Sequence, residues 1–171
     1  RAHESRFIKG CTTYRIGTGR AVLMKPMQYP ISELPERIPG ETFVRRANGT
    51  RWYIHVNFLQ GNPIQIFAHT NHADKSQVSN TVLRALEKLL TLQGVPTETL
   101  DEYADKSKTK AEQMTRWISL GLRYGISTDE ICAAIDKTNA TIDTLPWQLA
   151  YCLRSVGGSH ENQVREVAVC P

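Results

Sequence analysis

The sequence has no long apolar run and no dense cluster of like charges. None of its hydrophobic stretches approaches the roughly 20 residues that a membrane-spanning helix needs, so we expect no membrane segment. Its 21 basic and 17 acidic side chains give a net charge of +4, which permits contact with phosphates without arguing for nucleic acid. An N-terminal signal segment is also missing, and the start at Arg1 predicts a fragment or a processed product.

Cysteine is scarce, and its spacing argues against the usual disulfide and zinc frameworks. The four cysteines lie far apart, without any CxxC pair. They indicate free thiols of a cytoplasmic protein. Cys132 and Cys152 fall on the apolar faces of expected helices, where cysteine packs as a small hydrophobic side chain. Cys11 is expected to be structural as well, whereas Cys170 lies in a polar tail.

Residues 41–94 predict a three-stranded meander followed by an amphipathic helix. In the middle strand Trp52, Ile54, Val56 and Phe58 alternate with polar residues, so one face of the sheet is expected to be buried. The Asn48-Gly49 pair predicts a tight hairpin turn, and residues 59–62 predict a second turn. The expected strands are residues 41–46, 51–58 and 64–70. The apolar stripe of the helix expected at residues 76–93 can cover the buried face.

Three more helices are expected after Gly94. Residues 95–107 look like a polar loop with at most one helical turn, and residues 108–124, 128–138 and 146–156 have helical apolar spacing. Ser127 and Glu130 predict a capping box at the start of the second of these helices. Trp52 and Trp117 are expected in the core. The predicted fold class is therefore α+β, with an antiparallel three-stranded meander packed against about four helices.

The first forty residues have the sequence pattern of short strands and a linker, unlike the residues that follow. Short β-branched and aromatic runs predict strands at residues 11–16 and 21–24, and the prolines between residues 25 and 40 predict an extended linker without regular structure. The expected division is a strand-bearing remnant at 1–24, a linker at 25–40, an α+β domain at 41–156 and a flexible tail at 157–171.

Two stretches resemble one enzyme family. Lys9-Gly10-Cys11-Thr12-Thr13-Tyr14-Arg15 is similar to the Lys-Gly-x-Thr-x-Tyr-Arg segment near the end of the catalytic barrel in adenosylcobalamin-dependent (class II) ribonucleotide reductases. Residues 37–156 resemble the TSCPD domain that follows that barrel, through residues 37–43, 52–57, 63–69 and 119–125. Two departures stand out. The namesake motif is here Asp143-Thr144-Leu145-Pro146-Trp147, and the chain stops at Cys170-Pro171, where a cysteine-rich tail would begin.

The resemblance implies the C-terminal part, or a small subunit, of an enzyme that reduces ribonucleotides to deoxyribonucleotides by a radical mechanism. Most of the barrel is absent, including the radical-forming cysteine and the contacts to adenosylcobalamin, so this chain is not expected to turn over alone. The cofactor would be bound by the missing barrel. The implied partners are the remainder of the catalytic chain or a large subunit, a thioredoxin-like reductant and nucleotides, within an oligomeric assembly.

Four residues are candidate site residues under this resemblance. Tyr14 would line the active site at the barrel wall, and Cys170 would be the first thiol of a redox tail that passes electrons by thiol–disulfide exchange. Lys9 and Arg15 would reach nucleotide phosphates through charge-assisted hydrogen bonds. The simpler alternatives are a packed strand aromatic for Tyr14, a lone exposed thiol for Cys170, and surface charge for Lys9 and Arg15.

Other readings of the chain stay open. His69 and His72, with Asp74, have the residue types of a metal site but lack a convergent third strong ligand, so no metal is expected. A free-standing protein- or nucleotide-binding module without catalysis is one alternative to the reductase. A small nucleic-acid-binding protein is another. Its contact surface would use Arg45, Arg46, Arg51, Lys106, Lys108 and Lys110, which otherwise form a solvated face.

Overall fold

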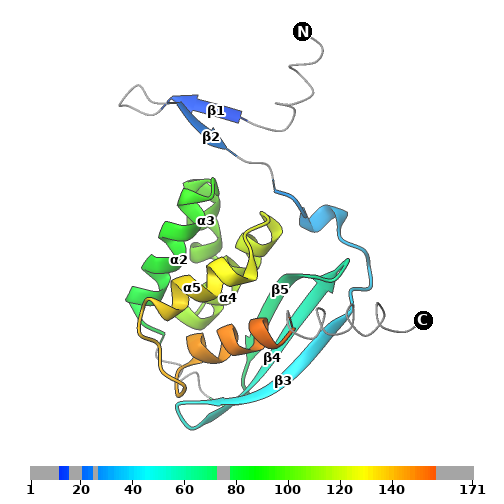
Figure 1. Cartoon of the computed structure of the whole chain (residues 1–171), viewed down its shortest axis with the longest axis vertical. Helices are drawn as coiled ribbons and strands as arrows, with labels where there is room; N and C mark the ends of the chain where they lie inside the picture. The colour runs from blue at the N-terminus through cyan, green and yellow to red at the C-terminus, as the bar shows by residue number, and fades with distance from the viewer. Residues whose placement is uncertain (1–11, 16–20, 25–26, 73–77, 157–171) are drawn as a thin grey trace, which may run out of the picture.

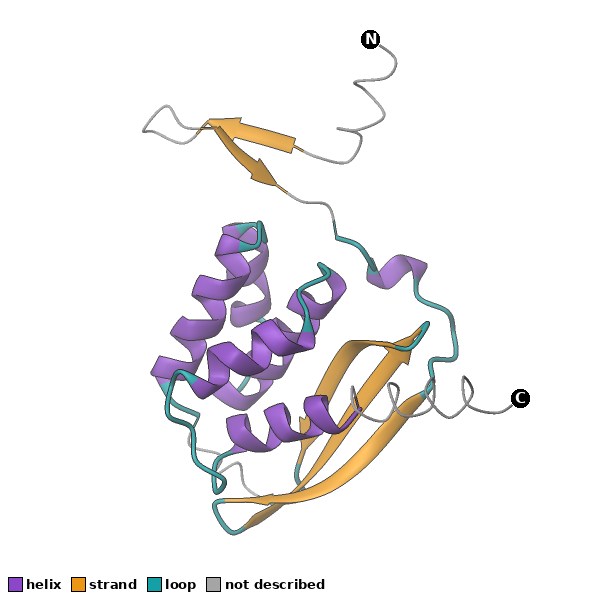
Figure 2. Ribbon diagram, viewed as in Figure 1, coloured by secondary structure: helices purple, strands orange, loops and turns teal. Residues whose placement is uncertain are grey.

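The computed structural model describes residues 12–15, 21–24, 27–72 and 78–156. A three-stranded antiparallel sheet in the order β3-β4-β5 carries helices on one side (Figures 1 and 2). This arrangement confirms the predicted α+β class. The strands are β3 (Gly40–Ala47), β4 (Thr50–Leu59) and β5 (Asn62–His69). The helices are α2 (Asn80–Leu92), α3 (Thr97–Asp105), α4 (Lys110–Arg123), α5 (Thr128–Asp136) and a last helix over residues 145–156.

Both turns of the meander form where the sequence predicts them. Asn48 and Gly49 have φ values of 50° and 73°, and Gln60 and Gly61 have φ values of 52° and 81°. Two successive residues with positive φ match the right-handed twist of the strands that they join. Glycine and asparagine adopt these angles at low cost, which explains why these positions end the strands.

The two faces of β4 differ as the alternation predicts. Trp52, Ile54 and Val56 are at most 2% exposed, whereas Tyr53 and His55 on the opposite face remain partly accessible. Successive side chains of a strand point to opposite faces, so one face is closed by the helices and the other is left open. The open face is therefore the side of the sheet that a ligand or partner could reach.

The helix that packs most closely on the sheet is α4, and the expectation that α2 covers it is wrong. α4 packs against β5, and α2 packs against α4 and α5 as an outer layer. Small residues allow α4 to be enclosed: a Cβ on Gly121 would lie 3.5 Å from Leu90 of α2 and 3.3 Å from Ile126. Ser119 and Thr115 are buried in the same helix. The apolar spacing of α4 indicates which of its faces is buried, but it does not indicate which elements cover that face, so the central position of α4 was not predicted.

Residues 97–105 form helix α3, where the sequence analysis expected a loop. The segment is acidic, and only one of its side chains is buried, Leu100 at 1% exposure. Trp117 of α4 anchors it, because the indole Nε1 donates a 3.0 Å hydrogen bond to the carbonyl of Leu100. Packing on α4 therefore stabilises a helix that would be too short to be stable alone.

The ends of the helices follow their capping residues. α2 begins at Asn80 rather than Ser76, because Ser79 is the residue whose side chain accepts the amide of Val82, at 3.3 Å. At the start of α5 the predicted capping box is present, with Ser127 and Glu130 satisfying each other's backbone amides.

The segment before the sheet contains more order than predicted. β1 (Thr12–Arg15) and β2 (Ala21–Met24) pair antiparallel as a sheet of their own, which confirms the two expected strands. The expected linker holds a 3-10 turn at Ile31–Glu33, so the absence of regular structure was a wrong prediction. The linker is also attached to the domain, since the amide of Tyr29 donates a 2.9 Å hydrogen bond to the carbonyl of Arg123.

Candidate functional site

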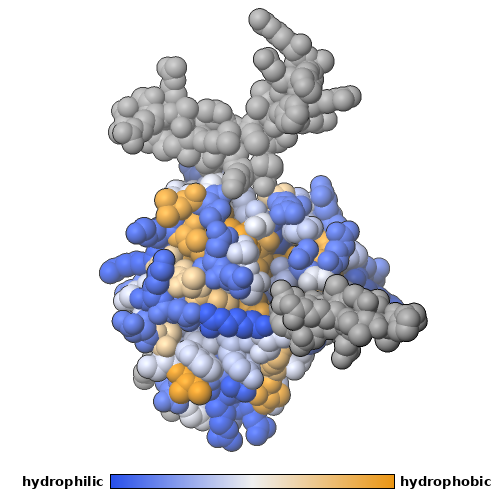
Figure 3. Space-filling view, in the orientation of Figure 1, coloured by the Kyte–Doolittle hydropathy of each residue, from blue (hydrophilic) through white to orange (hydrophobic). Residues whose placement is uncertain are grey.

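The open face of the sheet combines rings and cations without any carboxylate. Strand alternation and the register place the side chains of this face opposite one another, in rows that cross neighbouring strands. The residues of this face are Thr42, Val44 and Arg46 on β3, Arg51, Tyr53, His55 and Asn57 on β4, and Gln65, Phe67 and His69 on β5. In the view of Figure 3 the described surface is mostly polar, with apolar residues in separate patches. A ring-rich face without acidic groups is suited to planar, anionic ligands.

Three rings on this face stack on one another. The ring of His69 lies 5.3 Å from that of Tyr53 and 5.1 Å from that of His55, with interplanar angles of 18° and 14°. His55 is further held by a 2.8 Å hydrogen bond between its Nδ1 and the Oγ1 of Thr42. Cross-strand packing thus fixes the rings in nearly parallel planes that stand on the sheet.

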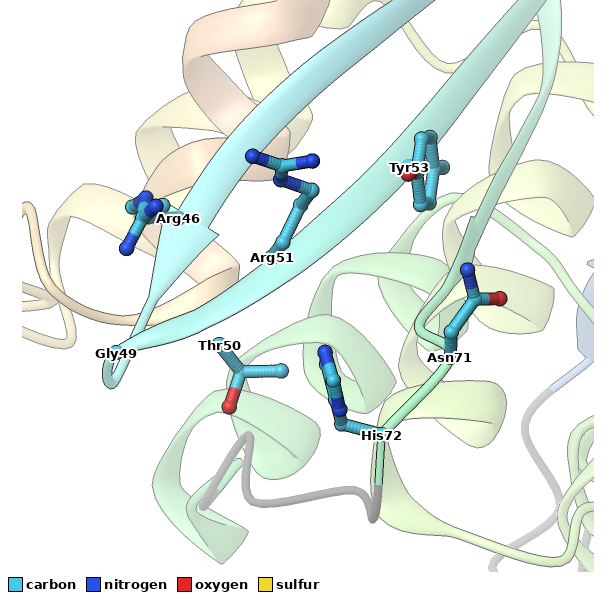
Figure 4. A pocket seen from close by; sticks show the side chains of 7 residues that line it. All are labelled: Arg46, Gly49, Thr50, Arg51, Tyr53, Asn71 and His72. Atoms are coloured by element: carbon cyan, nitrogen blue, oxygen red, sulfur yellow. The ribbon is translucent and has the colours of Figure 1, made fainter.

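A hollow of about 620 Å³ lies at the hairpin end of the open face (Figure 4). Arg46 and Arg51 stand opposite each other across β3 and β4 and form one part of its wall. Neither guanidinium belongs to an ion pair within the described ranges. The complete lining is Arg46, Gly49, Thr50, Arg51, Tyr53, Asn71 and His72. The hollow therefore presents two unpaired cations beside an aromatic ring.

The short segment after β5 forms the opposite wall of the hollow. The Oγ1 of Thr70 donates a 2.8 Å hydrogen bond to the carbonyl of Arg51 and accepts the amide of His72 at 3.3 Å. These two bonds hold Asn71 and His72 next to β4, and both side chains line the hollow. The wall is thus positioned by the Thr70 hydroxyl, which bonds backbone groups on both sides, and not by the Asn71 and His72 side chains that line the hollow.

Two of the four candidate residues from the sequence lie on strand β1, and the other two are not described. Tyr14 pairs with Val22 and Arg15 pairs with Ala21 in the β1–β2 sheet. Lys9 and Cys170 fall outside the described residues.

The two described cysteines are buried, as predicted. Burial raises the pKa of the Cys132 thiol to about 11 and that of the Cys152 thiol to about 12. Both groups are at most 1% exposed, and the Cys132 thiol donates to the carbonyl of Ala150 at 3.6 Å. A thiol in such a setting is neither a nucleophile nor an exchange partner at neutral pH.

The basic residues considered for nucleic acid do not share one surface. Arg45 points to the helix side of the sheet, where its Nε donates a 2.7 Å hydrogen bond to Gln148 and its guanidinium lies 4.2 Å from the ring centre of Tyr151. Lys106 pairs with Glu102 on α3. Only Arg46 and Arg51 of that set belong to the open face.

The two histidines that have the residue type of metal ligands lie in different environments. His69 belongs to the ring stack, and His72 lines the hollow. Asp74 lies outside the described residues. Within the described ranges, no three His, Cys, Asp or Glu side chains converge as metal ligands would.

Neither the ring stack nor the hollow was predicted from the sequence. Alternation alone places Tyr53 and His55 on one face, but the position of His69 depends on how β5 is aligned with β4. The alignment includes an irregularity at Asn57 and Phe58, which shifts the register. A bulge of this kind has no reliable sequence signal.

Within the described residues, no helix has the length and apolar character needed to cross a membrane. Searches with family models, among curated proteins and among solved structures return no match to this chain.

Proposed function

We propose that this chain is the C-terminal part, or a small subunit, of an adenosylcobalamin-dependent ribonucleotide reductase. In this proposal the α+β domain is a scaffold and contact surface, and the reacting groups come from the rest of the enzyme. Adenosylcobalamin would supply the radical chemistry from the barrel, outside this chain. The partners would be the large catalytic portion, nucleotides and a thioredoxin-like reductant, in an oligomeric assembly in the cytoplasm.

The observation that carries the proposal is the role of the motif residues in α4. The segment resembling the Ile-Ser-x-x-x-Arg-x-Gly pattern includes Ser119, Arg123 and Gly125. Ser119 holds the edge of β5, and the carbonyl of Arg123 holds the linker through Tyr29. Gly125 has a φ of 86° at the end of the helix, where other residues would be strained. Ser119 through its hydroxyl and Gly125 through its positive φ thus have physical tasks in this fold, which supports the resemblance at these two positions. The bond from Tyr29 reaches the backbone of Arg123 and does not depend on its side chain.

In this proposal the thiol chemistry is carried by the tail, residues 157–171. Cys132 and Cys152 are buried with raised pKa values, so they are poor candidates for electron transfer. Cys170 stays the candidate for exchange with a reductant, since Cys11 is expected to be structural. Tyr14, with Lys9 and Arg15, stays the candidate for contact with the reacting nucleotide.

Co-purification tests the proposal most directly. The tagged chain, expressed in its native source, should bring down a large partner, and the complex should reduce ribonucleotides only when adenosylcobalamin is added. In the complete enzyme Tyr14→Phe should lower turnover, whereas the matched Tyr151→Phe on the last helix should not. Absence of any such partner, with the chain folded and monomeric alone, would overturn the proposal.

The second candidate is a free-standing protein- or nucleotide-binding module without catalysis. The open face with its hollow favours this candidate, because two guanidinium groups without an ion-pair partner among the described residues lie next to stacked rings and have no evident task in stability. Monomeric behaviour together with ligand binding would support the module over the reductase part.

A further inference from the structure

We propose that the hollow beside Tyr53 binds a nucleoside phosphate, with the base stacked on Tyr53 and a phosphate group held between Arg46 and Arg51. This inference names a ligand for the open face of the sheet. Such a site is compatible with a free-standing binding module and with a part of a reductase. The binding test uses this chain alone, so a negative result would leave the reductase proposal standing.

The phosphate half of the site rests on the two arginines. Arg46 and Arg51 are directly opposite each other in the register, and like charges in that position repel. No ion pair neutralises either of them within the described ranges. An anion between two guanidinium groups removes the repulsion and accepts hydrogen bonds from both forks, which is the geometry that phosphate recognition uses.

The base half rests on the ring stack. His69 covers one side of Tyr53, at 5.3 Å between ring centres, and His55 continues the stack beyond His69. Tyr53 lines the hollow but His69 does not, so Tyr53 is the end of the stack that the hollow exposes. A base placed there would be the next ring in the series. Stacking on an aromatic side chain binds bases of any sequence, because every base has a π-face.

The remaining wall suits the polar edges of such a ligand. Asn71 offers an amide that can donate and accept, and His72 adds a second imidazole, on a segment tied to Arg51 through Thr70. The volume of about 620 Å³ falls within the range of small-molecule sites. Figure 4 shows Arg46, Arg51 and Tyr53 on the strands, with Asn71 and His72 on the facing segment.

The distribution of charge favours a single nucleotide over a polynucleotide. The cations of the open face are confined to the row of Arg46 and Arg51, at one end. At the other end Asn57 and Gln65 bond each other through their amides, at 3.2 Å, and offer no charge to further phosphates. A strand of nucleic acid needs cations along its whole path.

The test is direct binding by the full chain, measured by titration calorimetry without added metal. The probes are ATP, adenosine and inorganic triphosphate. ATP is expected to bind at least 10-fold more tightly than either of its parts, because the site recognises both base and phosphate. Equal affinity for ATP and triphosphate would overturn the proposal, and so would tighter binding of an oligothymidylate than of ATP.

Variants separate the two halves of the site. Arg46→Gln and Arg51→Gln should each weaken ATP and triphosphate about 10-fold, as expected for loss of a charge-assisted contact. Tyr53→Ala should weaken ATP about 10-fold and leave triphosphate unchanged, whereas Tyr53→Phe, which keeps the ring, should bind ATP as the natural chain does. The control is Arg84→Gln on the exposed side of α2, which should change neither. Folding of each variant is checked by circular dichroism, and unchanged ATP binding by a folded Arg51→Gln variant would contradict the assignment.

Discussion

The hydroxyl group of Ser119 makes two hydrogen bonds to the backbone of a single residue, Ile66. Its Oγ accepts the amide of Ile66 at 2.9 Å and donates to the carbonyl of Ile66 at 2.9 Å. Ile66 lies on β5, an edge strand with unpaired backbone groups on its outer side. The serine therefore closes the edge where α4 packs on the sheet, in a setting that water does not reach.

Replacing Ser119 by alanine should destabilise the domain. The substitution leaves a buried amide and a buried carbonyl without partners, which costs about 1–3 kcal/mol for each group left unsatisfied. Urea unfolding followed by circular dichroism measures the change. Ser155→Ala on the last helix is the matched control, because the Ser155 hydroxyl bonds a carbonyl at an exposed position, and its effect should stay within about 0.5 kcal/mol. Equal effects of the two substitutions would show that the contact to Ile66 contributes little.

The buried Arg123 and its partly buried partner Tyr103 should respond differently to substitution. Arg123 is 3% exposed, its Nε has no partner, and one of its terminal nitrogens donates to the Tyr103 hydroxyl at 3.3 Å. Burial lowers the pKa of Arg123, and the neighbouring Tyr103 partly offsets this. Tyr103→Phe removes the hydroxyl acceptor and should cost about 1–3 kcal/mol of unfolding free energy. Arg123→Met removes the buried charge and should be neutral or stabilising. Thermal unfolding of both variants tests this prediction. A large loss of stability for Arg123→Met would mean that the contacts of the guanidinium outweigh the cost of burying it.

The buried thiols should make the domain less stable at alkaline pH. The pKa of Cys132 is about 11 and that of Cys152 about 12 in the folded chain, against an ordinary value of 9.0. The folded state therefore holds these protons more tightly, and the stabilisation is complete below pH 9.0 and is lost as pH rises toward 11 and 12. Between pH 8 and 10 the loss should be about 1 kcal/mol for each thiol.

Urea unfolding at the two pH values measures that loss. The double variant Cys132→Ala and Cys152→Ala should lose less stability than the natural chain over the same interval, even if its stability at pH 8 is lower. Identical pH dependence in both proteins would exclude the thiols as the cause. Labelling with a thiol reagent gives an independent check, since Cys132 and Cys152 should react only after unfolding.

Local signals in the sequence predict much of this fold. The alternation in β4, the Asn48-Gly49 turn and the capping box of Ser127 each specify geometry within a few residues. These features depend on steric and hydrogen-bonding preferences that neighbours along the chain determine. They therefore appear in the structure where the pattern predicts them.

Features that depend on packing were missed. Helix α3 is stabilised by Leu100 and the indole of Trp117, a contact between distant segments. The central place of α4 depends on Ser119 and Gly121, whose small size matters only once β5 and α2 lie beside them. The candidate site has the same origin, because Tyr53 and His69 meet only in the observed register. Tyr14 was instead chosen by resemblance, which no contact of the described residues tests.

The repulsion between Arg46 and Arg51 should cost stability that the chain recovers when an anion binds. Arg46→Gln removes one of the opposed charges and should raise the unfolding free energy by about 0.2–1 kcal/mol at low ionic strength. In about 1 M salt the gain should vanish, because the screening length falls to about 3 Å. Arg84→Gln should show neither effect.

Addition of ATP should reverse the order of the two proteins. A ligand that binds only the folded state stabilises it in proportion to the logarithm of its concentration over its dissociation constant. The natural chain should gain melting temperature with ATP, and Arg46→Gln should gain much less. If Arg46→Gln were instead less stable than the natural chain without ligand, the two guanidinium groups would not repel each other, and the argument for an anion between them would lose its physical basis.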